Sequence, residues 1–159
     1  MTEDSRKQMF LGSLAIIGGG LLMLLQRALF ATGAGGLIQT TPLTRQVYAA
    51  NHFTPAALVV FLVSATCAVV WYRRTLKRSV HYAPKDKGAA RVTWGLILLF
   101  PLLSIIVALF FWGNASPKAV SWLAGFLVID VLVIYWLSTA LSTPDLMVPT
   151  VPGASLVRN

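Results

Sequence analysis

The segment VTWGLILLFPLLSIIVALFFWG, residues 92–113, decides the fold of this chain. Its 22 residues carry no charge and directly follow Arg91. An α-helix rises about 1.5 Å per residue, so about 20 apolar residues span the ~30 Å hydrocarbon core of a bilayer. The segment is therefore predicted to form a transmembrane helix.

Three further stretches have this character, at about 8–27, 55–72 and 118–141. They are apolar on all sides, as lipid-exposed helices are, and they lack the two-residue alternation of membrane strands. The sequence therefore predicts an all-α, polytopic membrane protein with four transmembrane helices. Residues 1–143 are expected to form one transmembrane domain, and residues 144–159 a proline-bearing tail.

Composition points the same way. Of 159 residues, 57% are apolar and 11% are charged, whereas soluble domains carry about 25% charged residues. This excludes a disordered chain or a collagen and argues against a soluble enzyme. A single cysteine excludes an intrachain disulfide and a tetrahedral cysteine site, and we expect no cofactor and no metal.

The first stretch also resembles a signal peptide, but Gln26 and Arg27 interrupt its exit, so we expect a retained helix.

The basic residues are concentrated in one connection. Because lysine and arginine gather in cytoplasmic loops, this connection and both termini are predicted to be cytoplasmic, in a bacterial-type inner membrane. Attraction to anionic headgroups would add about 1 kcal/mol per residue. The run lacks interleaved aromatic residues apart from Tyr82, so no nucleic acid is expected. Seven of the 13 basic residues lie between the second and third stretches: Arg73, Arg74, Lys77, Arg78, Lys85, Lys87 and Arg91.

Asp130 is an isolated carboxyl group near the midplane of the fourth stretch. A charge there costs several kcal/mol, so the group must be protonated, hydrated or paired. One hypothesis is a proton or ion relay. The other, which we favour, is a carboxyl that locks helices together, because relays use several acidic or histidine groups and no second intramembrane acid exists. Candidate partners are Ser64, Thr66, Ser104 and Arg27.

Small residues recur at four-residue spacing, which lets helix backbones approach closely. Gly125 and Asp130 lie about 140° apart around the fourth helix, so this helix has two distinct faces and suits neighbours on both sides. The pairs are Ala15 with Gly19, Ser64 with Ala68, Ser104 with Ala108, and Ser121 with Gly125.

Two segments outside the four stretches remain open. Residues 32–38 are glycine-rich and would extend the first helix, fold back as a hairpin or contact a neighbouring protein. Residues 45–53 are expected to form a surface helix on the outer leaflet, with Tyr48 and Phe53 facing lipid. The tail would either dock on a partner or remain a loose terminus.

Signs of catalysis are few. His52 and His81 fall on opposite sides of the membrane, and Cys67 lies inside a helix, where a thiol usually serves packing. The group Arg45, Tyr48, Asn51 and His52 would suit an anionic ligand.

We therefore expect no enzyme, but a small non-catalytic subunit of a larger membrane complex, with the bilayer and other membrane subunits as partners. A small oligomeric channel or transporter using Asp130 is the alternative, and a membrane enzyme acting on a lipid or redox substrate is third.

Overall fold

The computed structural model describes residues 3–33, 41–79, 83, 86–114 and 116–158. Every regular element among them is a helix. Four helical spans are long and apolar enough to cross a membrane, and they are Arg6–Thr32, Thr44–Lys77, Lys87–Trp112 and Pro117–Ser142. The predicted all-α fold with four membrane-spanning helices is confirmed.

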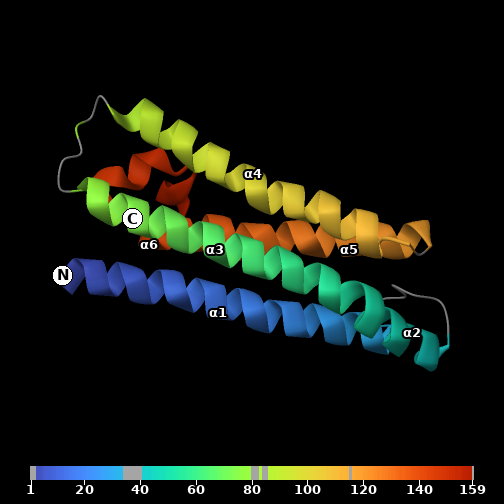
Figure 1. Ribbon diagram of the computed structural model, residues 1–159. Coiled ribbons are helices and arrows are strands. Elements are labelled where there is room, and N and C mark those ends of the chain that lie inside the picture. The colour runs from blue at the N-terminus through green and yellow to red at the C-terminus, as the bar shows by residue number, and fades with distance from the viewer. Residues whose placement is uncertain (1–2, 34–40, 80–82, 84–85, 115, 159) are drawn as a thin grey trace.

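The four spans form a bundle. Helices α3 and α5 lie between α1 and α4, and both chain ends lie with the α3–α4 connection at one end of the bundle (Figure 1). We call this the basic end, because exposed Arg6, Lys7, Arg73, Arg74, Lys77, Lys87 and Arg91 belong to its helix ends. The opposite end is the far end. The long helices are α1 (Glu3–Thr32), α3 (Thr54–Ser79), α4 (Lys87–Trp112) and α5 (Pro117–Val131).

The second span begins well before the predicted residue 55. Helix α2 (Pro42–Tyr48) and the π-helix η2 (Ala49–Phe53) run without a break into α3. Tyr48 and Phe53 are 7% and 0% exposed, because their rings lie 5.4 and 5.0 Å from the ring of Phe30. The expected surface helix with lipid-facing Tyr48 and Phe53 is therefore wrong.

The π-helix has a local cause in Pro55. Proline has no N–H, and inside an α-helix its ring clashes with the carbonyl four residues earlier, here that of Asn51. A wider turn relieves this clash, and the N–H of Thr54 bonds to the carbonyl of Ala49, five residues back. The Thr54 hydroxyl donates to the same carbonyl at 2.6 Å.

The first connection is described only in part. Helix α1 continues to Thr32, beyond the predicted end at residue 27. Gly33 follows with a positive φ of 69°, which favours glycine and ends the helix. Residues 34–40 lie outside the described part of the chain, and with them most of the glycine-rich segment for which three conformations are expected.

The last span is also composite. Helix α5 continues through the π-helix η4 (Leu132–Leu137) into α6 (Ser138–Ser142). It ends at Thr143, whose extended backbone matches the restriction that proline imposes on the preceding residue.

The tail folds back on the bundle, which neither sequence expectation foresaw. It forms two short 3-10 helices, η5 (Asp145–Thr150) and η6 (Ala154–Leu156), and η5 contacts α4 and α3. Met147, Val151 and Ala154 are buried. The Trp136 indole donates to the carbonyl of Pro152 at 2.8 Å. The prolines exclude a long helix but allow these tight turns, and the described tail packs on the chain's own helices.

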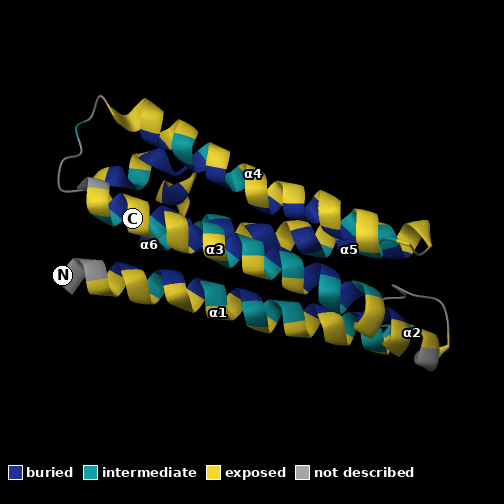
Figure 2. Ribbon diagram, viewed as in Figure 1, coloured by how far each residue is buried: buried dark blue, intermediate teal, exposed yellow. Residues whose placement is uncertain are grey.

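Buried residues face the interior of the bundle, while exposed residues cover the outer sides (Figure 2). Large apolar side chains dominate the outer faces of α1 and α4. Soluble monomers rarely expose such continuous apolar surfaces, which here suit contact with lipid tails. They include Phe10, Leu14, Ile17, Leu21, Leu96, Phe100, Leu103, Ile106 and Phe110.

Candidate functional site

Asp130 lies inside the bundle, on the face of α5 that points toward α1. Its side chain is 0% exposed, and its polar neighbour is the amide side chain of Gln26, which is 2% exposed. Within the described residues, neither group completes a hydrogen bond of normal geometry. The Asp130 carboxyl group and the Gln26 amide therefore lie side by side in an apolar interior, and both could accept or donate further hydrogen bonds.

None of the sequence-predicted partners of Asp130 is hydrogen-bonded to it among the described residues. Arg27 donates from Nε to the Thr54 hydroxyl at 3.1 Å, and the Ser104 hydroxyl donates to its own helix at the Pro101 carbonyl, 2.7 Å away. Thr66 is exposed. Ser64 is fully buried, but its hydroxyl has no hydrogen-bond partner among the described residues.

Gln26 is the functional neighbour that sequence reasoning missed. It lies at the predicted edge of the first stretch, where a polar residue is ordinary and attracts no attention. In the structure α1 continues six residues further, to Thr32, so Gln26 lies inside the span. Gln26 could have been identified from the sequence only by predicting that the first helix continues past residue 27.

The small-residue pairs fall into two groups. The first group is buried in the bundle and consists of Ala15, Gly19, Ser64, Ala68, Ser104 and Ala108. A Cβ added at Gly19 would overlap the Ile134 side chain, so α1 and η4 approach closely there. The second group, Ser121 and Gly125, is exposed on α5. No described atom lies within 4 Å of a Cβ placed at Gly125.

The basic residues gather at one end, as their positions in the sequence imply. Arg73, Arg74, Lys77, Lys87 and Arg91 are exposed there. Arg91 also reaches the tail, where it donates to the Pro149 carbonyl at 3.5 Å. Arg78 belongs to α3, but its side chain is outside the description, and Lys85, His81 and Tyr82 lie outside the described residues.

No protein-family model, no curated protein and no solved structure matches this chain. Its function must therefore be argued from its own residues.

A second polar group surrounds the end of the last span. The indole N–H of Trp71 donates to the Thr143 hydroxyl at 2.9 Å, and that of Trp94 to the Thr139 hydroxyl at 3.1 Å. The Tyr135 hydroxyl donates to the Trp94 carbonyl at 2.9 Å. These buried bonds join α3 and α4 to η4 and to the end of α6. They hold together the helices against which the tail packs.

Arg158, near the end of the tail, contacts the end of α6. Its guanidinium donates to the carbonyls of Ala140 and Thr143 and forms an ion pair with Asp145. The last carbonyls of a helix have no partner within the helix. Arg158 therefore caps α6 and holds the tail against it.

The group Arg45, Tyr48, Asn51 and His52, near the far end, is brought together only in part. The rings of Tyr48 and His52 stack at 4.9 Å, and His52 Nδ1 is hydrogen-bonded to the Trp112 carbonyl at 2.9 Å. Asn51 is exposed. These contacts tie η2 to the end of α4. Among the described residues, no three histidine, cysteine, aspartate or glutamate side chains are close enough to hold a metal ion.

Proposed function

We propose that this chain is a small non-catalytic membrane subunit of a larger inner-membrane complex, such as a secretion, conjugation, respiratory or transport machine, held by helix packing. The observation that carries the proposal is the exposed pair Ser121 and Gly125 on α5. The other three small-residue pairs are buried in the bundle. A close-approach face without a described neighbour suits a transmembrane helix of another chain.

The surroundings of this pair support a helix partner. Trp122, Val128 and Ile129 are between 42% and 46% exposed on the same helix. Large side chains beside a small-residue groove provide the ridges between which a second helix would pack. Asp130 lies inside the bundle, beside Gln26, and is therefore not part of the proposed partner face.

The test compares two glycines with open surroundings. A Cβ at Gly125 or at Gly95 meets no described atom within 4 Å, so a leucine at either position should leave the bundle folded. Gly125→Leu fills the proposed groove on α5, whereas Gly95→Leu adds the same bulk to α4. Affinity-tagged variants extracted in mild detergent would be compared by particle mass and by the stoichiometry of co-purifying membrane proteins.

We expect wild type and Gly95→Leu to carry the same stoichiometric partners, and Gly125→Leu to lose them. Retention of the partners by Gly125→Leu would show that another face binds them. A discrete homo-oligomer without other proteins would favour a channel, and a monomer would contradict the subunit role.

A small oligomeric channel or transporter is the second candidate, and the buried Asp130 favours it. A carboxyl group within a membrane span is often part of an ion path, and here its oxygens have no hydrogen-bond partner among the described residues. Asp130→Asn separates the two candidates, because the amide preserves the shape of the side chain and removes its acidity. Ion flux that disappears while assembly persists would support transport, whereas unchanged flux would exclude it.

A further inference from the structure

Helices α1 and α3 meet at the far end and separate toward the basic end. At the far end the Arg27 guanidinium bonds to Thr54 at 3.1 Å, and near the middle of α1 a Cβ at Gly20 would lie 3.4 Å from the Phe61 ring. Closer to the basic end, α1 packs on α6 instead, where a Cβ at Gly12 would lie 2.7 Å from Ser142 Cβ. The separation leaves an open cleft of about 260 Å³.

The cleft is polar at its mouth and apolar at depth. Arg73 and Tyr72 are nearest the basic end of α3, whereas Ala68 on α3 and Ile16 on α1 lie one turn or more deeper. Ser138 and Ser142 of α6 also line the cleft, and the Ser138 hydroxyl donates to backbone carbonyls of its own helix. The lining residues are Met9, Gly12, Ser13 and Ile16 of α1, Ala68, Val69, Tyr72 and Arg73 of α3, and Ser138 and Ser142 of α6.

The charge of the cleft is one-sided. Its lining contains one cation, Arg73, and no acidic residue. Arg6 and Lys7 are exposed near the start of α1, but Glu3 and Asp4 precede them in the same helix, so Arg73 is the charge that distinguishes the cleft. An arginine at the end of a membrane span can extend its guanidinium to the headgroup layer, where it offers several donors to a phosphate.

The rim of the cleft is continuous with the lipid-facing surface. Met9 on α1 and Val69 on α3 are each 43% exposed, and exposed Phe10 and Val70 follow them on the outer faces. Pockets that enclose a whole small ligand usually measure about 300–1,000 Å³. A smaller cleft that opens onto the bilayer suits one part of a long molecule that arrives from the side.

We propose that this cleft binds one phospholipid with an anionic headgroup, its phosphate at Arg73 and one acyl chain along Ile16, Ala68 and Val69. The charge at the mouth selects the headgroup, and the apolar depth accepts the chain. The site is independent of the proposed subunit role, since no contact of the Ser121–Gly125 face enters it.

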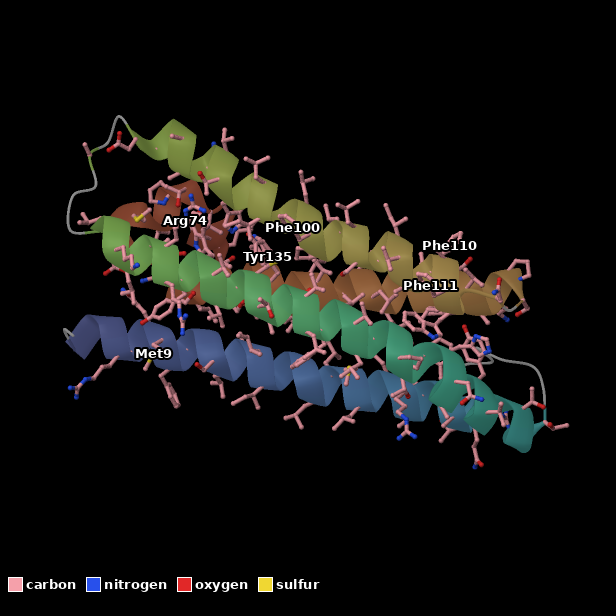
Figure 3. The ribbon with its side chains drawn as sticks, in the orientation of Figure 1. Met9, Arg74, Phe100, Phe110, Phe111 and Tyr135 are labelled. Carbon is pink, nitrogen blue, oxygen red and sulfur yellow. The ribbon has the colours of Figure 1, made fainter. Side chains whose placement is uncertain are left out.

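The test is the binding of phosphatidylglycerol and of phosphatidylcholine to protein purified in neutral detergent, counted by native mass spectrometry. Arg73→Gln removes the charge at the mouth. Arg74→Gln is the matched control, because Arg74 does not line the cleft and lies on the side of α3 toward α4 and the tail (Figure 3). Val69→Trp narrows the cleft from its exposed rim and leaves the charge in place.

We expect Arg73→Gln to weaken phosphatidylglycerol binding about tenfold, because it removes a charge-assisted contact. Arg74→Gln should change it by less than about twofold, since Arg74 does not line the cleft and a charge without a specific contact contributes little. Val69→Trp should weaken binding with Arg73 intact. Equal losses for the two arginine variants would mean diffuse attraction to the whole basic end and would overturn the proposal.

Two further outcomes would also overturn it. Equal binding of phosphatidylcholine would show that Arg73 does not select an anion. Displacement of the lipid by inorganic phosphate alone, with Val69→Trp behaving as wild type, would show that the cleft takes a free anion and not a lipid. Helix content and elution volume equal to wild type would show that each variant is folded, and Val69→Trp carries the test if Arg73→Gln does not fold.

Discussion

Two adjacent glycines of α1 have opposite surroundings. Gly18 is exposed, and a Cβ there would meet no described atom within 4 Å, whereas a Cβ at Gly19 would overlap Ile134. We predict that Gly19→Ala lowers the free energy of unfolding by about 1–3 kcal/mol, because overpacking forces the helices apart. Gly18→Ala should raise it by up to about 1 kcal/mol, since alanine favours a helix over glycine.

Thermal unfolding in one detergent, followed by circular dichroism, measures both variants. Because the two positions are neighbours with the same residue type, the helix propensity gained is the same and only the contact with η4 differs. If both variants were stabilised equally, α1 would not approach η4 at Ile134.

At the residue scale, the sequence identifies isolated charges but not their partners. Asp130 is conspicuous because it interrupts an apolar run. Gln26 is inconspicuous, because it sits where the apolar run meets Arg27 and an amide is ordinary there. Their proximity depends on how far α1 continues and on how it faces α5, and neither property is local.

Among the elements, the end of the last span depends on one buried hydrogen bond. Trp71 is 2% exposed, and its indole N–H donates to the Thr143 hydroxyl. Thr143→Val preserves the shape of the side chain but leaves this donor without its acceptor. We predict a loss of about 1–3 kcal/mol in the free energy of unfolding, the usual cost of an unpaired buried polar group, and faster proteolysis of residues 144–158.

Thr93→Val is the matched control. The Thr93 hydroxyl bonds to the Ala89 carbonyl of its own helix at 2.9 Å, and its side chain is only partly buried. Its replacement should change stability by no more than about 0.5 kcal/mol. Urea or thermal unfolding together with limited proteolysis gives both readouts, and equal effects of the two variants would argue against a structural role for the Trp71 bond.

The pairs Ser116–Pro117 and Thr54–Pro55 have different outcomes in this chain, although each places a hydroxyl residue before a proline. At Ser116–Pro117 the pair begins α5, and the serine hydroxyl accepts from the Ala119 N–H at 3.4 Å. At Thr54–Pro55 the helix is already under way from Pro42 and widens into a π-turn. The dipeptide alone predicts a start in both places. Only the burial of Tyr48 and Phe53 against Phe30, a tertiary contact, decides the second case.

For the whole molecule, composition and segment length were sufficient to predict four spans, because lipid requires every backbone group to be bonded within a helix. They could not predict the tail. Its position rests on contacts made by Trp136 and Arg158, which a terminus rich in proline does not reveal. The small-residue pairs predicted close approach but not which helix, or which chain, makes it.

The orientation of the bundle is a prediction of the charge pattern alone. The basic end carries seven exposed lysine and arginine residues on the ends of α1, α3 and α4, whereas the far end has only Arg27, Arg45 and Lys118. Short loops rich in lysine and arginine stay in the cytoplasm. We therefore predict that Gly88 faces the cytoplasm and Asn114 the outside. Both residues are exposed.

Single cysteines at these two positions, in a Cys67→Ala background, make the prediction measurable. In intact cells a membrane-impermeant maleimide should label Asn114→Cys and spare Gly88→Cys, which should react only after the membrane is permeabilised. The two positions adjoin opposite ends of α4, so a four-span bundle allows one of them, and not both, to react from outside. Labelling of Gly88→Cys in intact cells would invert the orientation and place the Arg73 cleft in the outer leaflet. Labelling of both would contradict a membrane-spanning α4.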